Sequence, residues 1–327
     1  MEPVRVGFVG LGWWGAELCR GALVHGAIEP VACHARSVES REAFSERFGA
    51  VPVETIDELF DRVEAVVVAT PHSTHADIVD AALRSGKHVF VDKPFTMTVD
   101  DGRRCIQAAE RANKVLQVGH QRRRQTPTRR IREMIDGGEL GTPIVAEANY
   151  SSPGGAKKDP DNWRQDRDER PLSGLTPFGV HVIDAFHYLL GPISAVTAVR
   201  GRPFGASALD DAAVFSFEFA SGAVGTLVTS TAVPTTTRLG VMGTAGAAWN
   251  DRDGELLLVQ EAGSTVPRVV QTEAIDAVAE QMLEFATCVR GGERPEVDGR
   301  AGLMVTAVVE AALQAASTGT KVEVAHV

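Results

Sequence analysis

The chain has 327 residues, of which 44% are hydrophobic and 23% are charged, proportions that suit a soluble protein with two cores. With 43 acidic against 33 basic residues its formal net charge is −10, which disfavours nucleic acid as a partner because phosphate backbones repel it. The four cysteines are isolated, with no C-x-x-C pair, so neither a disulfide framework nor a zinc site is indicated.

The order of segments also bears on location. No apolar run approaches the ~18 residues of a membrane-spanning helix, and a strand-like segment begins at Val4, which leaves no room for a signal peptide. We therefore expect a cytoplasmic protein without a membrane partner.

The first ~120 residues alternate strand and helix patterns. Val-rich runs bounded by Gly, Pro and charged residues predict strands, and the amphipathic stretches between them predict helices. This alternation predicts an α/β Rossmann domain, a doubly wound parallel sheet covered on both faces. The predicted strands are 4–10, 29–35, 51–53, 64–70, 87–92 and 115–120, and the predicted helices are 14–25, 37–49, 55–60, 73–86 and 98–113.

The pattern changes after Gln121. Short alternating runs separated by Gly turns predict a mostly antiparallel open sheet, and a Gly-, Pro- and charge-rich loop covers 151–175. We divide the chain into a dinucleotide-binding domain at 1–122 and an α+β substrate-binding and oligomerisation domain at 123–327. Predicted helices are 128–137, 181–191, 276–290 and 301–317, and predicted strands are 142–151, 193–201, 211–220, 222–232, 236–244, 255–260 and 321–324.

The segment VGLGWWG has the G-x-G-x-x-G spacing directly after the first strand and at the start of a helix. One glycine forms the tight turn, one lets the backbone approach a pyrophosphate, and one lets the helix pack close to the strand. The motif is weak alone, but this position between strand and helix predicts a dinucleotide site. Expected cofactor contacts here are Gly10, Leu11, Gly12, Trp13, Trp14 and Gly15.

The end of the second strand bears on which dinucleotide binds. Ala35 stands where an NAD site would place an acid, and Arg36 and Ser37 follow it. A guanidinium suits a 2′-phosphate, so NADP is favoured over NAD. The alternative is that Arg36 faces solvent and that Glu39 or a backbone group binds the ribose.

The fifth predicted strand ends in Asp92, Lys93 and Pro94, at the edge where open α/β sheets bind ligands. A lysine at a strand end is most often a solvated surface charge. A buried lysine, however, can have a lowered pKa and serve proton transfer. The residues alone leave both interpretations open.

A basic stretch, QRRRQTPTRR at 121–130, is the one feature that could bind a phosphate backbone. A solvated helix face or a few arginines beside a substrate is the more frequent explanation for such a stretch.

Five segments together resemble the Gfo/Idh/MocA family of NAD(P)-dependent oxidoreductases: VGLGWWG, VVVATPHSTHADIVDAALRSGKHVFVDKP, VGHQRR, NWR and GVHVIDAFHYLLG. The specific part is the family's T-P-x-x-x-H … A-G-K-H-V-x-x-E-K-P signature, matched here with Asp92 in place of the usual Glu. The resemblance extends through the whole chain. It implies a Rossmann domain followed by an open antiparallel sheet domain that often forms dimers or tetramers.

The resemblance also implies roles for individual residues. Lys93 would be the catalytic lysine that contacts the reacting hydroxyl, and Asp92 would accept from the nicotinamide ribose. Trp163 and Arg164 would lie near the nicotinamide carboxamide. His181 would act as general base or acid, a task that suits an imidazole. Other implied cofactor contacts are Thr70, Pro71, His72, His75 and Gln121.

One position departs from the family. Many members carry an Asp four residues before the histidine, but Pro177 stands there and cannot relay a proton. Asp184, three residues after His181, could share its helix face and orient it, or contact substrate. The alternative for Asp184 and His187 is a helix surface or a packed core position. Candidate substrate contacts are Lys93, Arg122, Arg123, Asn162, His181 and Asp184.

These observations predict an oxidoreductase that moves a hydride between NAD(P) and a hydroxyl or carbonyl carbon of a sugar, cyclitol or related polyol. No carboxylate or cysteine cluster completes a metal-ligand set around the histidines. Two alternatives remain open. One is an NAD-dependent, redox-assisted glycoside hydrolase, and the other is a non-catalytic, nucleotide-sensing regulator on the same fold.

Overall fold

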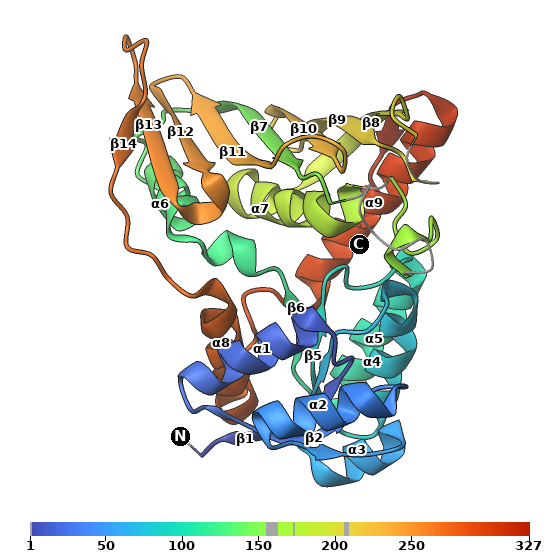
Figure 1. Ribbon diagram of the computed structural model, residues 1–327. Coiled ribbons are helices and arrows are strands. Elements are labelled where there is room, and N and C mark those ends of the chain that lie inside the picture. The colour runs from blue at the N-terminus through green and yellow to red at the C-terminus, as the bar shows by residue number, and fades with distance from the viewer. Residues whose placement is uncertain (1, 155–162, 173, 206–208) are drawn as a thin grey trace. The chain divides into compact units, whose positions relative to one another are not determined.

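The computed structural model describes residues 2–154, 163–172, 174–205 and 209–327 (Figure 1). The chain forms two compact units. The first contains Met1–Gln121 and Asp276–Thr306, and the second contains Arg122–Ile275 and Ala307–Val327. The first unit thus includes a segment from late in the chain, a return that the predicted boundary at residue 122 did not include.

Within the described residues, the first unit contains a six-stranded parallel sheet: β1 (Val4–Val9), β2 (Ile28–His34), β3 (Val51–Pro52), β4 (Ala65–Val68), β5 (His88–Asp92) and β6 (Leu116–Gly119). The strand order is β3-β2-β1-β4-β5-β6. The order reverses between β1 and β4, and such a reversal creates a ligand-binding crevice at the carboxyl ends of these strands. The predicted Rossmann sheet is confirmed.

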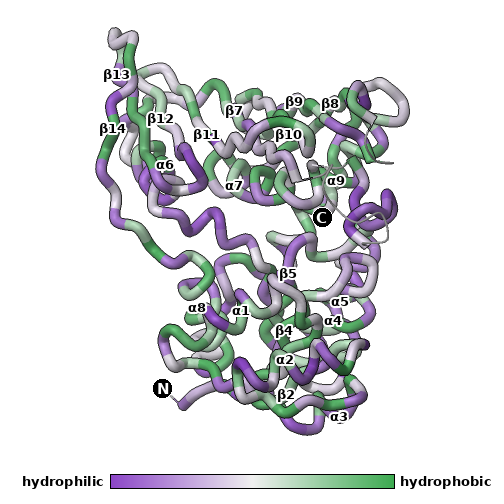
Figure 2. The backbone as a smooth tube through the Cα atoms, viewed as in Figure 1, coloured by the Kyte–Doolittle hydropathy of each residue, from purple (hydrophilic) through white to green (hydrophobic). Residues whose placement is uncertain are grey.

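The central strands are buried on both faces, which explains their continuous apolar sequence. All four residues of β4 are buried, and Figure 2 colours this strand as hydrophobic. From β1 to β2 the chain moves toward one side edge of the sheet, and from β4 to β5 it moves toward the other. Because both crossovers are right-handed, their helices lie on opposite faces of the sheet. The helices of this unit are α1 (Trp13–Val24), α2 (Val38–Phe48), α3 (Ile56–Arg62), α4 (His75–Arg84), α5 (Val99–Ala112) and α8 (Ala277–Gly291).

Local signals in the sequence set the ends of these helices. The Thr98 side chain accepts a hydrogen bond from the Asp101 backbone N–H and caps α5. Gly49 ends α2 in the left-handed conformation, with φ of 76°. The returning helix α8 lies beside α1 (Figure 1) and buries Met282 and Phe285 in the core of this unit.

The second unit is built on a mixed, mostly antiparallel sheet. In the described residues it has nine strands: β7 (Pro143–Ser151), β8 (Ile193–Gly201), β9 (Ala212–Phe219), β10 (Val224–Ser230), β11 (Thr236–Gly243), β12 (Gly246–Asp251), β13 (Leu256–Glu261), β14 (Arg268–Val270) and β15 (Val322–Glu323). Their order is β14-β13-β12-β11-β7-β10-β9-β8-β15, and β7 and β10 pair in parallel. The predicted fold class is confirmed, although β12 and β14 were not predicted.

Helices α6 (Thr126–Asp136) and α7 (Val180–Leu190) pack on this sheet (Figure 1). Side chains alternate between buried and exposed along β9, as expected when one sheet face is covered and the other is open. The exposed face presents Val199, Val214 and Val224.

A last helix, α9 (Gly299–Thr318), begins in the first unit and ends in the second. Of the helices described, it alone is long and apolar enough, by length and composition, to cross a membrane. Half of its apolar window is buried, as in a core helix.

Candidate active site

The glycine turn between β1 and α1 has the geometry of a phosphate-binding loop. Gly10 has φ of +92°, and a Cβ atom there would lie 2.5 Å from the Ala69 backbone. A Cβ atom on Gly15 would lie 2.0 Å from the Gly10 carbonyl oxygen. A Cβ atom on Gly12, in contrast, would meet no atom within 4 Å. Packing therefore requires the first and third glycines, whereas the second keeps the approach to the turn open.

The start of α1 also fits an anion. Gly12 is its N-cap and supplies no side-chain oxygen, so the first backbone N–H groups of the helix are left for another acceptor. Of the two tryptophans that follow, Trp13 is 77% exposed and Trp14 is half-buried, with ring centroids 5.4 Å apart. Leu11 is half-buried beside them. The residues at this turn fit the pyrophosphate of a dinucleotide.

At the end of β2, Arg36 and Ser37 have different surroundings. The Arg36 side chain is exposed and forms no ion pair with the residues that the structure describes. Ser37 caps α2 by accepting from the Ser40 backbone N–H, and its hydroxyl donates to Glu39 at 2.6 Å. That hydrogen bond lowers the pKa of the Glu39 carboxyl. Arg36 thus keeps its donors for a ligand, whereas Ser37 and Glu39 are engaged with each other.

Asp92 ends β5 with a side chain that is 9% exposed. Its Oδ1 atom is buried and accepts no hydrogen bond among the described residues. Burial raises the pKa of this carboxyl, and the nearby Lys93 side chain opposes the rise. An acceptor in this condition suits a hydroxyl donor such as a ribose. Gln121 similarly has a buried side-chain oxygen that accepts no hydrogen bond from the part of the chain that the structure describes.

Lys93 follows directly at the same sheet edge. Its side chain is half-buried, and its peptide bond to Pro94 is cis. The lysine is therefore not a fully solvated surface residue.

His75 is completely buried and contacts two loops at once. Its Nδ1 atom lies 2.8 Å from the Pro94 carbonyl oxygen, and its Nε2 atom lies 3.0 Å from the Thr70 carbonyl oxygen. It joins the loop that follows β4 to the one that follows β5. His72 is also buried and packs against His75, while Thr70 and Pro71 are half-buried. Sequence analysis missed this bracing role, because it depends on backbone carbonyls that no motif encodes.

In the second unit, α7 presents two buried polar residues. His181 is 4% exposed and Asp184 is fully buried. Asp184 accepts two hydrogen bonds from the Arg123 guanidinium, one of them at 2.9 Å from Nε. Burial makes such a charge pair strongly dependent on both partners. The predicted roles of Asp184, as an orienting or substrate-contacting group, stay predictions, and the pair with Arg123 was not foreseen.

Arg122 has different neighbours from Arg123. Its guanidinium donates to Asp253 at 2.9 Å and lies over the Tyr150 ring, 4.9 Å from the centroid. One of its terminal nitrogens, Nη1, is buried and lacks an acceptor among the described residues. This nitrogen is available to a polar ligand.

Most of the basic stretch at 121–130 is occupied within the unit. Arg123 pairs with Asp184, Arg129 donates to the Tyr188 hydroxyl, and Arg130 pairs with Glu139. These contacts do not leave a row of free cations for a phosphate backbone.

The residues before α7 form a π-helical turn at Leu175–Gly179, in which the Gly179 N–H donates to the Gly174 carbonyl five residues earlier. This turn holds an extra residue relative to an α-helix. In a regular α-helix, the residue four positions before His181 would lie one turn away on the same face. Because of the extra residue in the π-helical turn, Pro177 does not occupy that position, which the sequence pattern alone did not reveal.

The long loop is described only in part. Asn162 lies outside the described residues. Trp163–Gln165 forms a single 3-10 turn, and the Arg164 guanidinium lies 4.2 Å from the Trp163 ring centroid. The two predicted carboxamide contacts thus form one stacked pair.

Comparison with known proteins identifies both parts of the chain. A family model described as "Oxidoreductase family, NAD-binding Rossmann fold" matches residues 4–120. A second, "Oxidoreductase family, C-terminal alpha/beta domain", matches residues 132–324.

Similar proteins span nearly the whole chain. D-xylose 1-dehydrogenase (NADP(+)) of Haloarcula marismortui is 24% identical, covering 98% of this chain and 93% of that protein. scyllo-Inositol 2-dehydrogenase (NAD(+)) of Bacillus subtilis is 28% identical, covering 86% and 81%. The crystal structure of aldose-aldose oxidoreductase from Caulobacter crescentus, complexed with glycerol, superposes with a TM-score of 0.89 at 26% identity, covering 99% of this chain and all of that one.

Proposed function

The chain belongs to the Gfo/Idh/MocA family of oxidoreductases, and from this membership we propose that it transfers a hydride between NAD(P) and a hydroxyl or carbonyl carbon of a sugar, cyclitol or related polyol. The named activities of the xylose and inositol dehydrogenases to which it is similar support this substrate class. The observation in this chain that carries the proposal is the glycine turn, which is closed by packing at Gly10 and Gly15 and open at Gly12.

The first unit holds the cofactor. The α1 amides beyond Gly12 would bind the pyrophosphate, and the buried Asp92 oxygen would accept from the nicotinamide ribose. When bound, the nicotinamide supplies the hydride donor or acceptor. The protein's own part is to bind, orient and exchange a proton with the substrate.

We assign the proton chemistry to Lys93 and His181. Lys93 is half-buried at the end of β5 and would donate to the reacting oxygen. His181 is buried on α7 and would take the proton during alcohol oxidation or return it during carbonyl reduction. Arg123 would contact the substrate, and Asp184 would hold the Arg123 guanidinium in position for that contact.

The proposed cofactor preference is NADP over NAD. Arg36 is exposed and has no ion-pair partner in the described part of the chain, so it can meet a 2′-phosphate. Glu39, the group expected to bind a ribose hydroxyl in the NAD case, already accepts from Ser37.

We also propose that the protein is cytoplasmic and that two copies associate through the open face of the nine-stranded sheet. Val199 and Val214 are directly paired across β8 and β9, and both are exposed, at 71% and 43%. Exposed neighbouring apolar side chains on a regular sheet suit a symmetric, self-complementary interface. Val214→Asp should lower the molar mass in solution, measured by light scattering. The same molar mass for the wild type and the variant would contradict this assembly.

The main test is a thermal-shift titration with NADP and NAD, followed by a sugar and polyol panel monitored at 340 nm. We expect stabilisation by a cofactor and an absorbance change with at least one polyol. Cofactor retained through purification with no net absorbance change on turnover would indicate the glycoside hydrolase. Cofactor binding without any turnover, and a function that survives Lys93→Ala, would indicate the regulator.

A further inference from the structure

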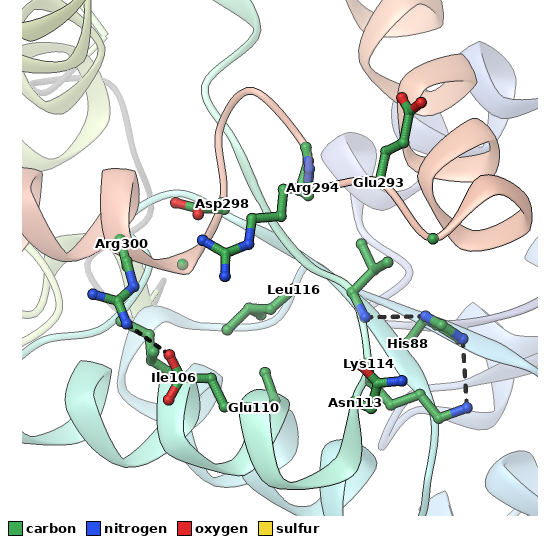
Figure 3. Close-up of a pocket in the computed structure, with 15 residues that line it drawn as sticks. His88, Ile106, Glu110, Asn113, Lys114, Leu116, Glu293, Arg294, Asp298 and Arg300 are labelled. Atoms are coloured by element: carbon green, nitrogen blue, oxygen red, sulfur yellow. Dashed lines mark hydrogen bonds and ion pairs between the residues drawn. The ribbon is translucent and has the colours of Figure 1, made fainter.

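The first unit has a pocket of about 270 Å³ at the sheet edge opposite the glycine turn (Figure 3). Its wall includes His88 and Leu116, the first residues of β5 and β6, whereas Asp92 ends β5 at the other edge. A strand of this length places the two edges roughly 13 Å apart. The pocket is therefore distinct from the proposed cofactor site.

The wall is rich in charge, and its acids are largely engaged. Glu110 pairs with Arg300 at 2.7 Å, and the Asp298 carboxylate accepts from the Ala301 backbone N–H at the start of α9. Figure 3 shows the Glu293 carboxylate directed away from Leu116, toward the outside of the pocket. Among the described residues, none of these acids forms an ion pair with Arg294 or Lys114.

Two cations in the wall lack a carboxylate partner. Arg294 and Lys114 form no ion pair with any residue of the described ranges. The Arg294 guanidinium extends across the pocket above Leu116, so its donors face the space and an apolar floor lies beneath (Figure 3). The wall as a whole is formally neutral, with Lys114, Arg294 and Arg300 against Glu110, Glu293 and Asp298, so the feature of interest is that two of its cations have no carboxylate in contact among the residues that the structure describes.

His88 adds a third donor. Its Nδ1 atom accepts from the Val115 backbone N–H at 3.0 Å, so the neutral ring carries its proton on Nε2. That Nε2 atom lies 3.5 Å from the Lys114 ammonium nitrogen. Burial first, and Lys114 second, lower the pKa of His88 to about 4, which keeps the ring neutral near pH 7. Two donors thus face each other, and an anionic oxygen that accepts from both would relieve the contact.

We propose that this pocket is a second small-molecule site that binds an organic anion, with acidic oxygens on Arg294 and on the Lys114–His88 pair and its carbon body over Leu116. Phosphate esters and polycarboxylates share this chemistry, since both offer several anionic oxygens on a small polar body. Neutral sugars have no anionic oxygens and should not bind here.

The test is calorimetric titration of the full-length protein without cofactor, in low-salt buffer free of phosphate, using glucose 6-phosphate, citrate and glucose as probes. At least one anion should bind with a dissociation constant of about 1 mM or lower, and glucose should not. Added salt should weaken the binding because the charges lie near the surface. Binding of glucose 6-phosphate alone would identify a phosphate site, and binding of citrate alone a carboxylate site.

Arg294→Gln should raise the dissociation constant at least tenfold. Arg62→Gln is the matched control, because it removes the same charge from an exposed position on α3 outside the pocket and should change the constant less than twofold. The proposal fails if neither anion binds, if Arg294→Gln binds as well as the wild type, or if Lys93→Ala abolishes the binding and Arg294→Gln does not. Since no turnover is measured, failure of the proposed enzyme activity would not affect this outcome.

Discussion

The candidate functional residues of the two units rest on different kinds of interaction. In the first, backbone atoms predominate: the glycine turn, the uncapped start of α1, and the carbonyls of Thr70 and Pro94 that meet His75. In the second, charged side chains predominate, and the Arg123–Asp184 pair joins residues 61 positions apart.

This difference has consequences for how each part responds to change. Backbone geometry tolerates substitutions that avoid a clash, so a change in the first unit can alter binding while the fold persists. A buried charge pair does not tolerate substitution of one partner, because the charge that remains is then uncompensated in a medium of low polarity. Function and stability should therefore separate in the first unit and remain coupled in the second.

The largest expected effect comes from breaking the buried pair. Asp184→Asn removes the carboxylate charge that the buried Arg123 guanidinium contacts and should lower the free energy of unfolding by about 3–5 kcal/mol. The double variant Arg123→Met/Asp184→Leu should recover much of the loss, since neither charge remains. Urea denaturation followed by circular dichroism measures both, and a loss below about 1 kcal/mol for Asp184→Asn would show that the second unit does not depend on the pair.

Lys93→Ala should separate chemistry from folding in the first unit. Turnover should fall on the order of 10²-fold or more because the proposed proton donor is lost, while cofactor affinity stays roughly unchanged. Steady-state kinetics and cofactor titration give the two numbers. Near-normal turnover would remove Lys93 from the mechanism.

The two ends of the glycine turn offer a matched pair of alanine variants. Gly10→Ala forces a positive φ and a contact of 2.5 Å with the Ala69 backbone, so it should destabilise the protein by about 1–3 kcal/mol. Gly12→Ala meets open space and should leave the melting temperature of the cofactor-free protein unchanged, while cofactor affinity falls about tenfold. Equal cofactor affinity in wild type and Gly12→Ala would mean that the cofactor does not approach this turn.

Arg36→Ala tests the cofactor preference at the end of β2. Affinity for NADP should fall about tenfold, as expected for loss of a charged hydrogen bond, and affinity for NAD should hardly change. Fluorescence titrations of the reduced forms provide the comparison. Parallel losses for both cofactors would rule out a 2′-phosphate contact.

The last expected effect concerns pH. The pKa of His88 is about 4 in the folded protein against 6.5 for the free side chain, so between these values the unfolded state binds the proton first. Stability should therefore decline as pH falls from about 6.5 toward 4. Urea midpoints at pH 7 and pH 5 should differ less in His88→Gln than in the wild type, and an identical difference would mean that His88 does not contribute.

The sequence predicted the features that rest on local chemistry. The glycine turn was predicted from its spacing directly after the first strand, and the structure has it. The Thr98 cap and the left-handed Gly49 likewise depend on residues close in the sequence. The strand β12 was not predicted, because Gly246, Ala247 and Ala248 have weak strand propensity and pairing with β11 decides their conformation.

The features that could not be predicted depend on contacts between distant segments. No spacing rule links Arg123 to Asp184, and no motif records that His75 meets two carbonyl groups. The π-helical turn before His181 likewise arises in a stretch containing Pro177, where a count of residues assumes a regular helix.

The return of Asp276–Thr306 to the first unit sets a rule for engineering this protein. A gene fragment ending at residue 121 would omit α8, and with it Met282 and Phe285, which are fully buried. Such a fragment would expose part of its interior and tend to aggregate. Exchange of the second unit between homologous enzymes therefore calls for two replaced segments, 122–275 and 307–327, rather than a single fusion point.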